Sequence, residues 1–579
     1  MADPGRFETF IGLDIGRINT RVSVFGISEG RYRLQGCEKS YTDFGYDGHL
    51  AAGVQQALAK LQTKLDRHFL RPAAIDAGRI AFNHGAVEQV GLTLSAFPPV
   101  DAAILGLTAR GSLAAGLELA GKLPVQISGA YGSADLADEP AVIDALLDSR
   151  PEILILTGGT DSGEGHLASR WVEVARMLCR VLPEPVRPAV FFAGNPELHS
   201  NVRRRLEPVC RLRILPNLQP IFGEQDDVPA QAEIGREILS LSMMKLPGLQ
   251  GLSQLAGDLI RTRGLMLDRM VRFFSRTKTQ RSKDEPLSGV LAIDLGAGST
   301  MVCVGRGGRS SAYRSQNTAD WPIDPDFVHR WTAAPVRRLE VEGYLANQRF
   351  FPGILPQSLT ELAMSQSLAR AKIRSALIGL ASRQASFGFD PDDGLMGHQA
   401  TIFASGAALT GAPTWGQAML ILLDSLRPWQ ETTMILDQHH ILPMLGLLAE
   451  AEPLLPVQVL GSDAFVNLGT VIPVVSQAQE GVLVLSVKVS MDSGKAYSVD
   501  IPQGALRRLL VPAGEAVTLT LDPALGADIG AGPGVSRQTR VTGGALGVVI
   551  DARGRPLRLP EKDEERIEHL RHWLWSLGG

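Results

Sequence analysis

The chain has 579 residues, too many for one ordinary hydrophobic core, so we expect several domains. Hydrophobic residues make up 45% of it and charged residues 20%, which is the composition of a globular protein. The formal net charge of −4 shows no basic excess, so we expect neither nucleic acid nor a membrane surface as a partner.

The cysteines and the N-terminal residues indicate in which cellular compartment we expect the protein. The four cysteines stand far apart, with no Cys-x-x-Cys or metal-binding spacing: Cys37, Cys179, Cys210 and Cys303. We therefore expect them to be reduced, as in a cytoplasmic protein. Residues 1–4 do not begin a basic segment followed by an apolar stretch, and no run of about 18 apolar residues occurs, so we expect neither a secretory signal nor a membrane span.

The strongest local pattern occurs twice. An apolar run at residues 10–16 ends in Asp-Ile-Gly, and a second strand pattern begins at Thr20. Residues 290–296 end in Asp-Leu-Gly, and the strand pattern resumes at Met301. Each pattern predicts a β-hairpin with a glycine-rich turn. Two such hairpins about 280 residues apart suggest that the chain contains two related halves.

Between the hairpins, the sequence predicts one helix and then an alternating α/β region. Apolar residues at 54, 58, 61 and 65 fall on one helix face. From about residue 95 to 220, strands alternate with helices, which predicts a small parallel α/β unit. The strands are 152–157, 189–193 and 212–215, and the helices are 167–178 and 197–206. A helical region from about 230 to 275 precedes the polar segment 276–286, which we interpret as a solvated linker.

The predicted secondary structure changes from helices to short strands in the last hundred residues. A helix-rich stretch covers residues 357–384, but beyond about 480 the pattern becomes that of short strands and glycine turns. Residues 517–521 alternate between apolar and polar side chains, which is typical of a half-buried strand. We predict a small all-β module here, followed by an amphipathic helix at 564–577.

The two hairpins have the residue types that polyphosphate binding needs. A tight glycine turn lets backbone N–H groups approach a phosphate closely, and nearby hydroxyls can donate to its oxygens. An aspartate at a strand end can hold Mg²⁺, usually through water. Facing hairpins would clamp a triphosphate and position a water for in-line attack. The predicted catalytic and metal-binding residues are Asp14 and Asp294, and the predicted phosphate-binding residues are Gly16, Arg17, Thr20, Gly296, Gly298, Ser299 and Thr300.

Two further glycine motifs are candidates for ligand binding. Residues 402–413 form a strand pattern followed by Gly406 and Gly411, which would let the backbone pass beside an adenosine; taken alone, the motif is typical of an ordinary strand-to-helix turn. In residues 157–163, Gly158 and Gly159 allow a tight turn, and Asp161 or its neighbour Ser162 could cap the next helix. That second motif fits an anion site and a plain capped turn equally well.

The order of these motifs resembles that of a known superfamily. Two phosphate hairpins followed by an adenosine loop are similar to the acetate kinase, sugar kinase, Hsp70 and actin (ASKHA) superfamily. Within it, residues 8–475 resemble the glutamate mutase L family, called MutL or GlmL, which is unrelated to the mismatch-repair protein of the same name. The other segments that carry this resemblance are 156–163, 192–195, 216–218, 416–418 and 468–472.

The resemblance implies an α/β fold with two lobes, of the actin/Hsp70-like (ribonuclease H-like) ATPase type, with an inserted α/β unit and a C-terminal all-β module. The implied domains are a first lobe at 7–286, which includes the inserted unit at about 95–225 and a helical linker, a second lobe with the adenosine loop at 287–475, a β-rich module at 476–560 and a C-terminal helix at 561–579.

The resemblance also implies a function. Members of this family are linked to adenosylcobalamin-dependent carbon-skeleton mutases such as glutamate mutase, as ATP-binding chaperones or reactivating factors. The implied cofactors are ATP and Mg²⁺, and the implied partners are mutase subunits. The chain has no Asp-x-His-x-x-Gly motif for cobalamin, so we do not expect it to be the mutase itself.

Two departures from the superfamily pattern leave hydrolysis open. Arg17 replaces a small hydroxyl residue in the first hairpin, where it either binds phosphate directly or fills the site. Met301 replaces the aspartate that usually ends the second hairpin. A non-hydrolysing scaffold that binds a protein partner is therefore an alternative. A small-molecule kinase is another, with Asp161 the one motif aspartate left to act as its base.

Overall fold

The computed structural model describes residues 9–42, 50–71, 80–83, 85–95, 99–161, 163, 166–221, 225–277, 288–316 and 323–578. The chain forms two compact bodies, which we call the first lobe (Met1–Met266 with Pro443–Pro456) and the second lobe (Leu267–Leu442 with Val457–Gly579). The predicted linker lies outside the described residues from position 278 onward. In the described parts of the chain, no helix combines the length and apolar character that crossing a membrane requires.

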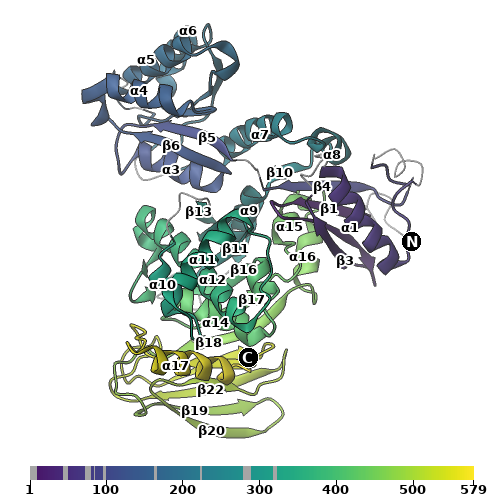
Figure 1. The fold of residues 1–579 in the computed structure, drawn as a ribbon, viewed down its shortest axis with the longest axis vertical. Helices are drawn as coiled ribbons and strands as arrows, with labels where there is room; N and C mark the ends of the chain where they lie inside the picture. Colours follow the sequence, from purple (N-terminus) through teal and green to yellow (C-terminus); the bar gives the residue numbers. More distant parts are fainter. Residues whose placement is uncertain are drawn as a thin grey trace. The chain divides into compact units, whose positions relative to one another are not determined.

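The first lobe is built on a five-stranded sheet with the order β10-β4-β1-β2-β3 (Figure 1). Strand β2 runs antiparallel to its neighbours β1 and β3, whereas β4 and β10 run parallel to β1. The apolar run of β1 is buried along its whole length because packed side chains cover the sheet. The elements are β1 (Thr9–Ile15), β2 (Asn19–Ser28), β3 (Arg31–Tyr41), α1 (Leu50–Leu65), β4 (Gln89–Leu94), α7 (Val228–Lys245), α8 (Leu249–Ala256) and β10 (Ile260–Thr262).

An inserted α/β unit lies between β4 and α7 in the sequence. Its five strands are all parallel, in the order β6-β5-β7-β8-β9, which is a doubly wound order. The predicted alternation of strands and helices is therefore confirmed. The elements are β5 (Val100–Leu105), α3 (Ser112–Lys122), β6 (Val125–Tyr131), α4 (Glu139–Ser149), β7 (Ile153–Leu156), α5 (His166–Val181), β8 (Ala189–Phe192), α6 (His199–Leu206) and β9 (Arg211–Ile214).

The second lobe repeats the sheet of the first. Its eight strands have the order β13-β12-β11-β16-β17-β18-β24-β21, and the first five match β3-β2-β1-β4-β10 in order and direction. This repetition confirms the prediction of two related halves and of the two-lobed, actin-like α/β fold. The elements are α9 (Arg263–Thr277), which begins in the first lobe, β11 (Gly289–Leu295), β12 (Ser299–Arg306), β13 (Arg309–Gln316), α10 (Pro325–Arg330), α11 (Arg338–Phe350), α12 (Leu359–Arg383), β14 (Phe389–Asp390), β15 (Gly394–Leu395), β16 (Gln399–Ser405), α13 (Ala407–Thr410), α14 (Trp415–Leu426), β17 (Thr432–Leu436) and β18 (Val466–Pro473). Between β17 and β18, α15 (Leu442–Leu448) belongs to the first lobe from Pro443 onward, and α16 (Leu454–Leu460) begins in the first lobe and ends in the second.

The C-terminal residues form a separate antiparallel sheet, β20-β19-β22-β23, as the sequence predicts. Two other strands of this region, β21 and β24, instead extend the sheet of the second lobe beyond β18. The predicted last helix is confirmed as α17, which packs on α14 and β21. The elements are β19 (Leu483–Met491), β20 (Ala496–Pro502), β21 (Leu506–Leu509), β22 (Ala516–Pro523), β23 (Arg537–Thr542), β24 (Val548–Asp551) and α17 (Asp563–Ser576).

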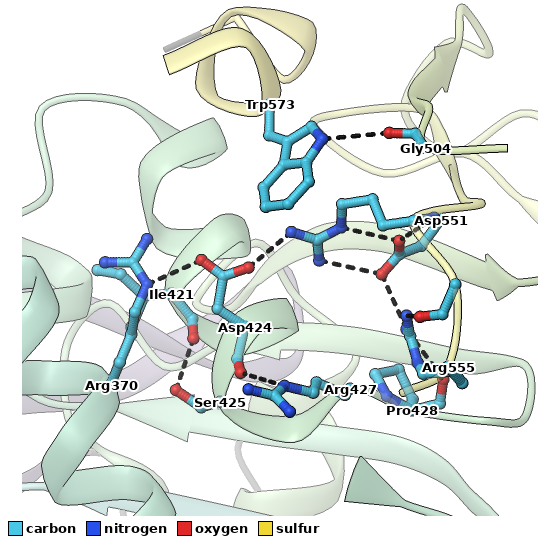
Figure 2. A network of polar contacts seen from close by, with 12 residues as sticks. Arg370, Ile421, Asp424, Ser425, Arg427, Pro428, Gly504, Asp551, Arg555 and Trp573 are labelled. Carbon is cyan, nitrogen blue, oxygen red and sulfur yellow. Dashed lines mark hydrogen bonds and ion pairs between the residues drawn. The ribbon is translucent and has the colours of Figure 1, made fainter. Parts of the chain in front are cut away.

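A buried ionic network joins the C-terminal region to the rest of the second lobe (Figure 2). Arg553 bonds to Asp424 of α14 at 2.6 Å and to Asp551 of β24 at 2.9 Å. Arg370 of α12 also reaches Asp424, at 2.8 Å, and Arg555 reaches Asp551 at 2.9 Å. Burial alone would raise the pKa of Asp551, but the two arginines beside it hold that pKa below its ordinary value. The carboxylate of Asp551 is therefore charged, and the ion pairs of Arg553 join β24 to α14.

Candidate functional site

The two predicted hairpins close with the same backbone turn. The N–H of Gly16 donates to the carbonyl oxygen of Asn19 at 3.0 Å, and the N–H of Gly296 donates to that of Ser299 at 3.0 Å. A Cβ atom added to either glycine would lie 2.8 Å from the same carbonyl oxygen. The turn therefore requires glycine at both positions, and the two hairpins have the same strand register.

Each hairpin aspartate is held by a hydroxyl from the next parallel strand. Asp14 on β1 stands beside Thr93 on β4, whose Oγ1 donates to Asp14 Oδ1 at 2.8 Å. Asp294 on β11 stands beside Ser405 on β16, whose Oγ donates to Asp294 Oδ1 at 2.8 Å. The hydroxyl fixes the carboxylate at the end of its strand in both lobes. Sequence reasoning missed Thr93, because no glycine motif marks the end of β4.

The second carboxylate oxygen distinguishes the hairpins. Asp14 Oδ2 lies 2.5 Å from Nη1 of Arg263, the first residue of α9, and 3.7 Å from Nη1 of Arg21 on β2. Asp14 is only 5% exposed. In the second hairpin, the residue that pairs with the aspartate across the strands is Met301 instead of an arginine, and Asp294 is half-buried. Sequence reasoning missed Arg263, which stands 249 residues from Asp14.

The predicted threonine donors face the interior of their sheets. Thr20 is fully buried, and its hydroxyl is hydrogen-bonded to that of Thr42 at 2.9 Å. Thr42 in turn donates to the carbonyl oxygen of Gly16, so both threonines brace the turn. Thr300 is equally buried, and its hydroxyl has no hydrogen-bond partner among the described residues. The residue equivalent to Thr42 is Asn317, which lies outside the described residues.

The remaining turn residues are half-buried. Arg17 follows Gly16, and partial burial lowers the pKa of its guanidinium from the ordinary value. The equivalent position in the second hairpin is Ala297, followed by Gly298 and Ser299. The first turn thus carries a cation where the second has a methyl group.

The third glycine motif packs against the second hairpin. Gly406 has φ +124°, and a Cβ atom there would lie 2.3 Å from the carbonyl oxygen of Leu295. Glycine at this position therefore lets the end of β16 approach the end of β11, which brings Ser405 to Asp294. Gly411 ends α13, and a Cβ atom there would lie 2.8 Å from the carbonyl oxygen of Ala407.

The motif of the inserted unit lies at the carboxyl edge of its parallel sheet. The amide nitrogen of Asn217, which follows β9, donates to the carbonyl oxygen of Gly159 and to Asp161 Oδ1, each at 2.9 Å. Gly158 lies against Asn195 after β8, whose N–H donates to the Gly158 carbonyl oxygen. The loops after β7, β8 and β9 are thus tied together. Ser162 lies outside the described residues.

The chain was compared with known protein families and structures. The model of one family, described as MutL protein, matches residues 10–320 and 322–464, well over half of the sequence. The chain belongs to the MutL family. The predicted resemblance is therefore confirmed, and the match includes both hairpins, the inserted α/β unit and the third glycine motif. No curated protein matches this MutL-family chain.

Solved structures with some likeness to the MutL-family chain include three of interest. They are an exopolyphosphatase from Cytophaga hutchinsonii (9% identity, 76% of this chain, 80% of that chain, TM-score 0.22), a xylulose kinase from Bifidobacterium adolescentis (12%, 77%, 94%, 0.25) and a diol dehydratase-reactivating factor in nucleotide-free form (11%, 57%, 75%, 0.18). All three TM-scores are low, so the fold assignment rests on the strand order.

The two aspartates of this MutL-family chain differ in their fitness for Mg²⁺. Mg²⁺ needs one or two carboxylates and keeps several waters, and Asp294 offers a half-buried carboxylate at the end of its strand. Asp14 does not fit, because Thr93 and two guanidinium groups already bond to its oxygens in a buried setting. No cluster of three or more histidine, cysteine, aspartate or glutamate side chains arranged for a metal occurs in the described residues.

Proposed function

We propose that this MutL-family chain binds ATP and acts as a reactivating chaperone for an adenosylcobalamin-dependent carbon-skeleton mutase. The observation that carries the proposal is the duplicated hairpin. The fold explains the glycine turns, but it does not require an aspartate bonded to a hydroxyl at the same position in both lobes. A ligand that needs both hairpins accounts for the duplication, and a nucleotide triphosphate has the charge and length that such turns accept.

The proposal gives each motif a role. The hairpin residues bind the phosphates through backbone N–H groups and side chains: Gly16, Arg17, Gly296, Gly298 and Ser299. Thr20 and Thr300 support the turns from within the sheets. The segment with Gly406 and Gly411 lies beside the adenosine, and Asp294 holds Mg²⁺, which would supply charge neutralisation for the phosphates. The loop with Gly158, Gly159 and Asp161 faces a ligand of the inserted unit, at the edge where doubly wound sheets bind.

The proposed partner is a radical enzyme that loses the adenosyl group of its cofactor and retains damaged cobalamin. Binding of ATP would favour one conformation of the chaperone, and that conformation would bind the inactivated mutase and release the damaged cofactor. This role places the chain in the compartment of the mutase, which we expect to be the cytoplasm.

Two measurements test the proposal. Isothermal titration of the full chain with ATP and Mg²⁺ should give saturable binding. An inactivated mutase should exchange damaged cobalamin for intact cofactor faster with the chain and ATP than with the chain alone. Asp294→Asn should weaken Mg²⁺-ATP binding about tenfold or more, whereas Asp463→Asn, at an exposed residue of the same lobe, should leave it unchanged. Absence of binding, or of any ATP effect on exchange, would contradict the proposal.

A non-hydrolysing scaffold is the second candidate, and the bonding of Asp14 favours it. An aspartate that is bonded to Arg263 at 2.5 Å is not available to position the attacking water or its metal. This candidate expects ATP to bind without release of phosphate, with and without the mutase. A steady phosphate release that Asp294→Asn abolishes would exclude it.

A further inference from the structure

The inserted α/β unit has a topological switch point at the carboxyl edge of its sheet. Strand β5 pairs with β6 on one side and with β7 on the other, so the chain leaves β5 in one direction and later returns on the opposite side. The loops after β5 and β7 touch there, because a Cβ atom at Gly158 would lie 2.8 Å from Cγ of Leu107. Doubly wound sheets bind their ligands at such a point.

Helix α3 begins directly after the loop of β5, and its first turn has donors to offer. The N-cap residue is Gly111, which has no side chain to cap the helix. The N–H groups of Ser112 and Ala114 have no hydrogen-bond partner among the residues that the structure describes. Such N–H groups carry the partial positive charge of a helix N-terminus, which attracts anions.

A second, independent feature reaches the same place. Gln219, in the segment after β9, is only 8% exposed, yet its side-chain amide has no hydrogen-bond partner within the described part of the chain. A Cβ atom at Gly111 would lie 3.3 Å from Oε1 of Gln219, so the amide group ends beside the start of α3. A buried amide without a partner is costly. A ligand bound at the first turn of α3 would supply that partner.

Hydrogen bonds hold the segment after β9 across this edge of the sheet. The N–H of Asp161 donates to the carbonyl oxygen of Pro220 at 3.0 Å, and the side-chain amide of Asn217 donates to Asp161 Oδ1 at 2.9 Å. The segment is therefore tied to the loop of β7 on both sides of Gln219. Its amide is positioned before any ligand arrives, which lowers the entropic cost of binding.

Arg110 adds a positive charge next to the first turn. It directly precedes Gly111, its side chain is exposed, and its guanidinium has no ion-pair partner among the described residues. A guanidinium can pair with two oxygens of one phosphate group through parallel N–H donors. The charge and the donor geometry thus favour a phosphate group over a neutral ligand.

We propose that Arg110, Gln219 and the first turn of α3 bind a phosphate group at the switch point of the inserted unit. The N–H groups of Ser112 and Ala114 donate to its oxygens, Arg110 balances its charge, and the amide nitrogen of Gln219 donates to it from the interior. This inference names the chemistry of the ligand that the proposed function assigns to the inserted unit, and it rests on the proposed function in that respect only.

Hydrogen exchange of the full chain, followed by mass spectrometry, tests the site with inorganic phosphate and with AMP. At least one of these probes should protect the amides of residues 106–116 in a saturable way. Arg110→Met should weaken this binding about tenfold without disturbing the fold, and Gln219→Leu should weaken it about fivefold. Arg180→Met is the matched control, at an exposed residue in the last turn of α5, and should leave the binding unchanged.

The two probes distinguish the sources of the phosphate group. Tighter binding of AMP would assign the site to a phosphate ester, and equal binding would assign it to the free anion. Absence of protection by both probes, or an unchanged affinity in Arg110→Met, would overturn the inference. Protection of residues 9–28 by ATP without protection of 106–116 by either probe would leave the proposed function standing alone, and the reverse result would leave the inference standing alone.

Discussion

The hairpin at Asp14 and the hairpin at Asp294 close the same turn with the same hydrogen bond, and each holds its aspartate with one hydroxyl from the next strand. Around this shared frame, Arg21 and Arg263 contact the aspartate of the first hairpin, and Met301 takes the place of Arg21 in the second. The comparison shows that the turn and the aspartate–hydroxyl pair form one structural unit, whereas the surrounding charge can change independently. Duplicated lobes can therefore keep their backbone and still diverge in chemistry.

The largest expected effect comes from removing the Arg263 guanidinium that pairs with Asp14. Arg263→Met leaves the buried Asp14 without its main partner, so the free energy of unfolding of the first lobe should fall by about 3–5 kcal/mol. Hydrogen exchange of the β1 and β4 amides measures this change without assuming that the whole chain unfolds in one step. The control Arg31→Met should have an effect below about 0.5 kcal/mol. A loss below about 1 kcal/mol for Arg263→Met would mean that Asp14 does not depend on this pair.

The turns themselves should respond equally in the two lobes. In Gly16→Ala and Gly296→Ala, the new Cβ atom would lie 2.8 Å from a backbone oxygen, so each lobe should lose about 1–3 kcal/mol of stability. Chemical denaturation followed by lobe-specific hydrogen exchange gives both values. Gly343→Ala on α11 is the control, because no atom lies within 4 Å of its Cβ position, and it should not destabilise. Clearly unequal losses would break the structural equivalence of the hairpins.

Removing the hydroxyl that holds each aspartate should have an effect similar in size to that of the glycine substitutions. Thr93→Val and Ser405→Ala each delete a hydrogen bond to a carboxylate, worth about 1.5–3 kcal/mol. The loss in Thr93→Val should lie at the upper end, because Asp14 is buried whereas Asp294 is half-buried. Thr93→Ser and Ser405→Thr keep the hydroxyl and should restore most of the stability. Thermal denaturation of the four variants decides whether the hydroxyl is the cause.

The smallest expected effect concerns the outer arginine. Arg21 lies 3.7 Å from Asp14, farther than Arg263 at 2.5 Å, so its Coulombic attraction is weaker and Arg21→Met should cost less stability than Arg263→Met. This substitution gives the first hairpin the residue found at the equivalent position of the second. Met301→Leu is the matched change in the second hairpin, and it should also cost less than about 1.5 kcal/mol. A much larger loss for Arg21→Met would show that both guanidinium groups are needed to neutralise Asp14.

The sequence predicted the backbone of the hairpins and not their partners. Apolar runs that end in Asp-x-Gly have a local period and a local turn signal, so both hairpins and the helix at α1 were predictable. Contacts such as that of Arg263 with Asp14 depend on which strands become neighbours in the sheet. Local sequence patterns do not predict this strand order. The sequence likewise gave no sign that the backbone of β11 lies beside Gly406.

The C-terminal region teaches the same point about long-range pairing. Alternating residues predicted its strands, including β22, but nothing local distinguishes the strands that form the separate sheet from β21 and β24, which join the second lobe. The choice depends on parallel pairing between β18 and β24, whose residues are about 78 positions apart, as in Thr470 with Val548.

The pairing of β24 with β18 makes the C-terminal region part of the second lobe's sheet. A truncation after residue 475 would strip a strand from the edge of β18, expose the apolar side chains beneath it and leave Asp424 without Arg553. Such a fragment would be prone to aggregate along its open edge. The last hundred residues therefore supply part of the second lobe's own sheet and core, and they cannot be removed as an independent module.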